Sequence, residues 1–151
     1  VINVMGAGLV PIPPSGLYAL YEPDGSVIGA TKGRHPSNHY LTTTAVNKLL
    51  VIAINYHHLN PQAPVLHIND ASLMWGGVFD IDAEADWNTP HEEHMRGTVV
   101  DIRANSRTGA IPPASFDSFI RLAKLTKMNA KIHSPGATNQ HFHVRLLNRS
   151  E

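Results

Sequence analysis

The stretch that organises this chain is residues 75–102, WGGVFDIDAEADWNTPHEEHMRGTVVDI. It ends in a short, mostly β-branched run at 98–102, which predicts a strand. His94 and Asp101 are separated by six residues, and residues 141–143 later read His-Phe-His. Two imidazoles and one carboxylate, with a further position open to water, are a typical ligand set for catalytic zinc. The stretch therefore predicts a metal-dependent hydrolase.

Strand geometry explains how these residues could meet. Side chains two positions apart on a strand share a face, so His141 and His143 are expected side by side. Gly97 permits a sharp turn that could fold His94 back over Asp101. If the two strands are neighbours, His94, Asp101 and one histidine of the pair converge on one point. The other histidine would then serve as a general base or acid, a task that suits an imidazole because imidazoles ordinarily titrate near neutral pH.

Composition limits the alternatives. The 151 residues suit one folded domain, with 42% hydrophobic and 16% charged residues. Formal net charge is zero, which argues against a nucleic-acid partner. The absence of cysteine excludes disulfides, thiolate metal sites and a cysteine nucleophile. Ten histidines are the unusual feature, and they favour a metal site or a pH-sensitive surface.

The order of expected elements predicts an α+β fold, with a small antiparallel sheet and helices packed mainly on one side. Residues 1–40 are rich in Gly and Pro and are expected to be a lead-in, a remnant of a preceding domain, ahead of a metal-binding domain at 41–151. The chain starts with Val1 rather than Met, as a mature or excised fragment would, and we expect no transmembrane segment. The expected elements are a hairpin around 17–28, a core helix at 45–56 capped from 42–44, a strand at 65–70, a helix from 115 or 117 to about 128, and strands at 131–133 and 141–147.

The string His91-Glu92-Glu93-His94 does not form a zincin motif. That motif needs two histidines four positions apart on a helix, and His91 and His94 are three apart. Pro90 and Gly97 also argue against a long helix here. We therefore interpret the two glutamates as solvated rather than as the catalytic base.

The pattern of H-x6-D with a later H-x-H resembles a zinc metallopeptidase superfamily. Its members are D-alanyl-D-alanine dipeptidases and carboxypeptidases, penicillin-insensitive murein endopeptidases and the hedgehog signalling domain. The context P-H-x-x-H-x-x-G-x-x-V-D-I at 90–102 is most similar to the murein endopeptidase version. The likeness covers roughly 72–147. The chain departs from that version at 138–140, where Thr-Asn-Gln stands in place of a further histidine.

The resemblance implies one zinc ion per chain, held by His94, Asp101 and His143. It implies His141 as the base or transition-state partner and His91 as a residue lining the site. It also implies a hedgehog-like or D-Ala-D-Ala-peptidase-like fold, a peptide or peptidoglycan substrate and an extracytoplasmic location. Arg96 is our own addition, as a cation for the oxyanion or for a substrate carboxylate.

Other interpretations stay open at this point. Iron(II) or manganese could occupy the same ligand set. The domain could instead be a non-catalytic zinc module that binds a partner, or a metal-free wall-binding module that uses Trp75 and Trp87. Structural roles account for five other histidines, which are expected in loops, at a helix end and on a strand: His35, His39, His57, His58 and His67.

Overall fold

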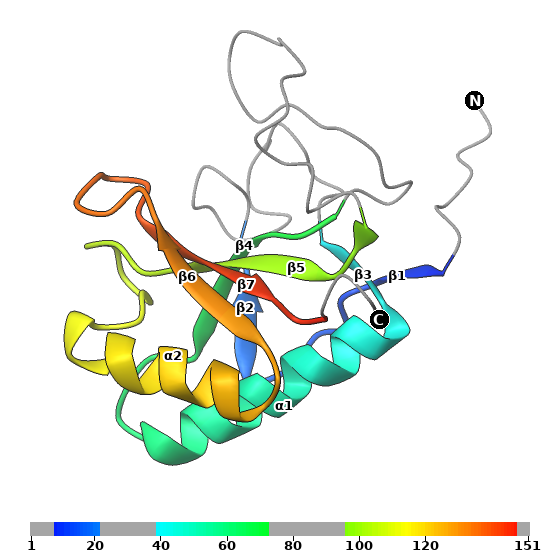
Figure 1. The fold of residues 1–151 in the computed structure, drawn as a ribbon, viewed down its shortest axis with the longest axis horizontal. Coiled ribbons are helices and arrows are strands. Elements are labelled where there is room, and N and C mark those ends of the chain that lie inside the picture. Colours follow the sequence, from blue (N-terminus) through cyan, green and yellow to red (C-terminus); the bar gives the residue numbers. More distant parts are fainter. Residues whose placement is uncertain (1–7, 22–38, 73–95, 148–151) are drawn as a thin grey trace, which may run out of the picture.

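A computed structural model describes residues 8–21, 39–72 and 96–147 (Figure 1). Within them lie two helices, a two-stranded sheet and a five-stranded sheet, which confirms the expected α+β class. The elements in chain order are β1 (Leu9–Pro11), β2 (Tyr18–Leu20), β3 (Tyr40–Thr42), α1 (Thr43–Leu59), β4 (Leu66–Asp70), β5 (Val99–Arg103), a short 3-10 turn (Pro113–Ser115), α2 (Phe116–Leu125), β6 (Asn129–His133) and β7 (His141–Arg145).

The larger sheet has the strand order β2-β4-β5-β7-β6. Its pairs are antiparallel except for β2 and β4, which run parallel. The sequence predicts an antiparallel sheet, and this one pair departs from that prediction. The reason is topological: α1 lies between β2 and β4 in the chain, and a connection that crosses over through a helix returns the second strand in the same direction.

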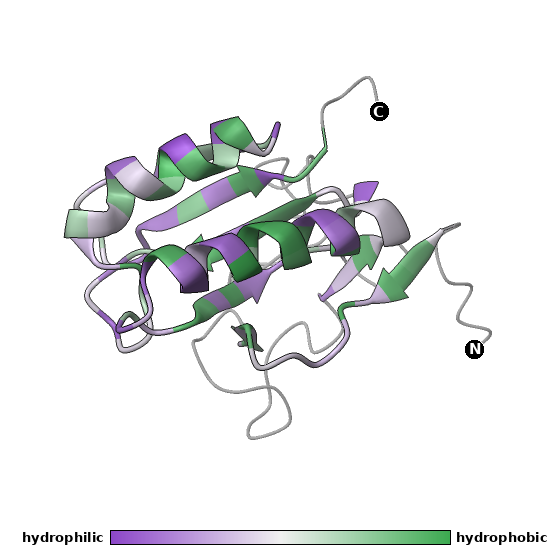
Figure 2. Cartoon of the chain, turned by 90° about the horizontal axis from the view of Figure 1, so that it is seen from below, coloured by the Kyte–Doolittle hydropathy of each residue, from purple (hydrophilic) through white to green (hydrophobic). Residues whose placement is uncertain are grey.

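Both helices cover the same face of the five-stranded sheet (Figure 1), as expected from the sequence. The predicted N-cap of α1 is confirmed, since Thr42 Oγ1 accepts a hydrogen bond of 3.2 Å from the Ala45 amide. The buried apolar residues of α1 recur at helical spacing and pack into the core, but hydrophobic residues also lie on the outer side of the helix, since Val51, Ile54 and Leu59 are exposed. Figure 2 shows hydrophobic and hydrophilic residues interspersed along both helices. The buried residues of α1 are Ala45, Val46, Leu49, Ile52, Ala53 and Tyr56.

The core lies between these helices and the sheet. In β7, the side chains buried in this core determine which side chains lie on the opposite face of the sheet. Phe142 and Val144 are fully buried in the core. Phe142 packs against Phe119 at 4.8 Å between ring centroids and against Phe116 at 5.2 Å. Because side chains alternate along a strand, burying Phe142 on the helix side directs His141 and His143 to the other face.

Part of the Gly/Pro-rich segment 1–40 packs with the rest of the domain. β2 forms one edge of the five-stranded sheet, and Ile12 and Tyr18 belong to the core. The partner expected for the hairpin, residues 27–28, lies outside the described residues, as do Trp75 and Trp87. The domain boundary at residue 40 stays a prediction.

Gly97 makes the turn that the sequence predicts ahead of β5. Its φ is +66°, a left-handed conformation that favours glycine. A Cβ atom there would meet the Leu9 side chain and the backbone at Leu41 and Thr42. The Gly97 carbonyl accepts a 2.8 Å hydrogen bond from the Thr42 amide, so the entry to β5 is fixed against β3.

Among the residues described, no helix has the length and apolar character needed to cross a membrane.

Candidate functional site

Strand register brings the predicted site residues of β5 and β7 together. Asp101 lies directly opposite His143 in the antiparallel pair of β5 and β7. On the other side of β7, His133 of β6 lies opposite His141. Directly opposed residues of antiparallel strands have their side chains on the same face. Three adjacent strands therefore present one carboxylate and three imidazoles on the face away from the helices.

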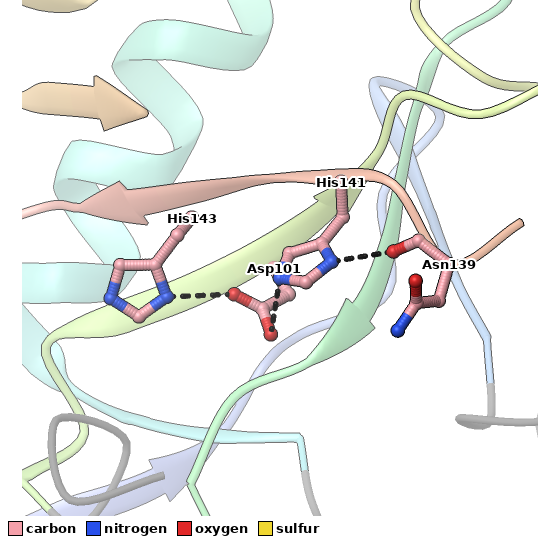
Figure 3. A network of polar contacts seen from close by, with 4 residues as sticks. All are labelled: Asp101, Asn139, His141 and His143. Atoms are coloured by element: carbon pink, nitrogen blue, oxygen red, sulfur yellow. Dashed lines mark hydrogen bonds and ion pairs between the residues drawn. The ribbon is translucent and has the colours of Figure 1, made fainter. Parts of the chain in front are cut away.

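The Asp101 carboxylate lies between the two imidazoles of β7 (Figure 3). Its Oδ1 is 3.0 Å from Nδ1 of His143, and its Oδ2 is 3.5 Å from Nε2 of His141. Asp101 and His143 are buried, with exposed fractions of 6% and 8%, whereas His141 is partly open to solvent. The carboxylate is thus held inside the protein with a more accessible imidazole beside it.

The backbone fixes the tautomer of His141. Its Nδ1 lies 2.8 Å from the carbonyl oxygen of Asn139, which can only accept a hydrogen bond. Nδ1 must therefore carry a proton, and in the neutral ring Nε2 has a free lone pair. That lone pair faces a carboxylate oxygen, so a proton or another cation is needed between the two atoms to make the contact favourable.

The loop before β7 is anchored well enough to hold His141 in place. The Gln140 side chain donates to the Ala104 carbonyl at 2.6 Å and accepts from the Gly136 amide at 2.7 Å. The Asn105 side chain donates to the Thr138 carbonyl at 3.1 Å. Two of these bonds tie the loop, at residues 138 and 140, to the segment that follows β5, and the third closes the loop on itself.

The donor atoms of Asp101 and His143 fit a shared metal ion. In a tetrahedral zinc site with bonds of ~2.0–2.1 Å, two ligand atoms lie about 3.3 Å apart. The observed separation of 3.0 Å between Oδ1 and Nδ1 is close to that value. An ion bound by both atoms would replace the proton that they share here. The carboxylate and imidazole types also suit zinc.

Two of the predicted site residues lie outside the part of the chain that the structure describes, namely His94 and His91. Within the described ranges, no three imidazole or carboxylate side chains converge closely enough to hold a metal by themselves. Arg96 is exposed, and no hydrogen bond or ion pair joins it to Asp101, His141 or His143. The ligand role of His94 and the roles of His91 and Arg96 stay predictions.

Sequence reasoning missed His133. Its ring stacks on the His143 ring, with centroids 4.6 Å apart and planes 4° apart. It also meets the His141 ring edge to face at 5.5 Å. Burial, followed by the neighbouring His143 and His141, lowers the pKa of His133 below its usual value. The signal in the sequence was weak, because only the strand order β5-β7-β6 makes His133 a neighbour of the site.

Two other histidines, His39 and His67, are buried. Burial lowers the pKa of both His39 and His67 to about 4, and the nearby Arg103 guanidinium adds to the effect at His67. The His67 ring stacks on the Tyr21 ring, with centroids 4.4 Å apart. The guanidinium carbon of Arg103 lies over the Tyr21 ring, 4.7 Å from its centroid. The structural role expected for His67 stays a prediction.

The chain was also compared with known proteins. No protein-family model matches it, and a search of curated proteins finds no significant match.

Proposed function

We propose that the protein is a zinc-dependent peptidase. The observation that carries the proposal is the Asp101 carboxylate on β5, placed between His143 and His141 of β7. An adjacent carboxylate and imidazole suit two ligand positions, and a second imidazole within 3.5 Å of the same carboxylate suits proton transfer. A purely structural metal site has no need of that second imidazole.

Each residue has a distinct role in this proposal. Asp101 Oδ1 and His143 Nδ1 are ligand atoms, and His94 is the expected third ligand. A zinc ion held by these residues would supply Lewis acidity and lower the pKa of a bound water toward neutrality. His141 accepts a proton at Nε2 when water attacks the scissile carbonyl, and its Nδ1–H bond to Asn139 keeps Nε2 directed at the site. Asp101 stabilises the resulting imidazolium by charge.

We infer that the substrate is a peptide of the cell wall, or another peptide that contains D-amino acids. Support for the substrate comes from the resemblance of residues 90–102 and 141–143 to the murein endopeptidase motif. An extracytoplasmic location belongs to the same proposal, because peptidoglycan lies outside the cytoplasm.

Metal analysis combined with hydrolysis assays tests the proposal. Zinc per chain is measured by elemental mass spectrometry after dialysis, and hydrolysis is followed on peptidoglycan fragments. The wild type is expected to hold about one zinc and to be active, and His143→Ala and Asp101→Asn are expected to lose both. His141→Ala should keep the metal while kcat falls by ~10²–10⁴-fold, the usual contribution of a general base.

A matched control is His57→Ala, which removes an exposed histidine near the end of α1. It should change neither metal content nor activity. A wild-type protein that binds no metal even after zinc is added back would refute the proposal. Bound zinc with full activity in His141→Ala would remove His141 from the mechanism.

A further inference from the structure

We propose that His133 is a positioning residue for the metal ligand His143. The His133 ring, stacked on the His143 imidazole, fixes the plane in which Nδ1 of His143 points at Asp101. This inference rests on the proposed function in so far as His143 is a ligand. The placement of the two rings is independent of it.

The contact is close and nearly parallel. The ring centroids are 4.6 Å apart and the ring planes differ by 4°, within the range of stacked aromatic pairs. His133 lies opposite His141 in the register of β6 and β7, which makes it a diagonal neighbour of His143. Diagonal neighbours on adjacent strands are within reach of aromatic side chains.

Stacking supplies an orientation that the hydrogen bond alone does not. The bond from His143 to Asp101 restrains one ring atom, Nδ1, at 3.0 Å. The torsion that turns an imidazole about its Cβ–Cγ bond has broad, weakly separated minima, so the ring could still tilt about that restrained atom. A second flat ring against its face opposes the tilt. A ligand atom held in this way loses less orientational freedom when it binds a metal.

Two variants of His133 separate a positioning role of its flat ring from a role of its nitrogen atoms. His133→Ala removes the ring, and His133→Phe keeps a flat ring without nitrogen atoms. The matched control is Asn129→Ala, an exposed residue on the same face of β6 that lies opposite Arg145. Zinc affinity is measured by competition with a chelating dye. The ring-proton shifts of His143 are measured by NMR in the metal-free protein, after assignment with His143→Ala.

We expect His133→Ala to weaken zinc binding by about two- to ten-fold, which corresponds to the stability of one aromatic pair. It should also move the His143 ring protons downfield, because the shielding of the stacked ring is lost. His133→Phe should restore both quantities toward the wild-type values, and Asn129→Ala should leave both unchanged.

The outcomes distinguish the two proposals. If the wild type binds no zinc, the proposed function fails, and the His143 shifts still decide whether the rings stack in solution. Wild-type zinc binding together with unchanged affinity and shifts in His133→Ala would overturn the positioning role. So would a weakened His133→Ala that His133→Phe does not rescue, because a nitrogen atom of His133 rather than its flat ring would then be responsible.

Discussion

The alternation of side chains along β7 gives the sharpest test of the site, because a shift by one residue would turn both site histidines into the core. Phe142 has no exposed surface and packs on Phe116 and Phe119. His141 lies on the other face, where its best-defined partner is the Asn139 carbonyl. Replacing each residue with alanine should therefore have very different costs.

The expected costs follow from these contacts. Truncating a buried phenylalanine costs about 3–5 kcal/mol, and the loss of two ring pairs places Phe142→Ala in the upper half of that range. At this chain length, 4 kcal/mol lowers Tm by about 8–16 °C. His141→Ala loses one hydrogen bond to a partly exposed side chain, which is worth about 1 kcal/mol or less.

Urea unfolding measures both variants against the wild type. A lower midpoint with an unchanged slope reports a change in stability alone. The control is Leu125→Ala, since that leucine is 76% exposed and its loss should change stability by less than ~0.5 kcal/mol. A cost for Phe142→Ala below about 1 kcal/mol, or one smaller than that of His141→Ala, would refute the register and the site built on it.

Three further predictions concern the scaffold. Gly109→Ala should destabilise the protein by about 2–4 kcal/mol in urea unfolding, because φ is +81° and a Cβ atom would overlap the His67 ring. The control is Gly136→Ala, where φ is +78° but no described atom lies within 4 Å of the added Cβ. That variant should cost only about 1 kcal/mol. Burial lowers the pKa of His39 and of His67 from 6.5 to about 4, so the unfolded chain binds more protons between these values. Stability should be greatest above pH 6.5 and fall as pH drops toward 4, by no more than about 3 kcal/mol per histidine, and glutamine at either position should flatten that fall. Thr42→Ala should cost about 1 kcal/mol by removing the N-cap of α1, measured as a lower thermal midpoint, and an unchanged midpoint would contradict the capping role.

Local patterns predicted the helices well, and the differences have local causes. α1 begins at the predicted cap because its apolar period and the Thr42 hydroxyl indicate the same start. α2 was expected to reach Met128 but ends at Leu125. The Thr126 hydroxyl donates to carbonyls of the last turn at 2.9 and 3.0 Å, and Lys127 adopts φ +59°. These two features stop the helix in spite of a continuing helical composition.

Strand pairing was predicted less well, because it depends on residues distant in the sequence. The run around Tyr18 suggested a hairpin with residues close by, since a nearby turn signal makes that partner the simplest one. In the described residues, Tyr18 pairs in parallel with Leu66, across the whole of α1, whereas the expected hairpin partner at 27–28 lies outside them. Helix α1 can bury its apolar residues only against strands of the sheet. The crossover from β2 through α1 to β4 supplies such strands, and it buries more apolar surface than a local hairpin would.

The difference between local patterns and strand pairing also explains which part of the site could be predicted from the sequence. Spacing of two along β7 assigns His141 and His143 to one face, and this holds whatever strand lies beside them. Spacing says nothing of the next strand, so the neighbour of His143 on its other side remained unknown. The order β5-β7-β6 brings β6 to that side, where the ring of His133 reaches His143 across the diagonal, while Asp101 contacts His143 from β5. His143 is therefore restrained from two strands at once, by a hydrogen bond to Asp101 of β5 and by the stacked ring of His133 of β6, so replacing either of these two residues should disturb it.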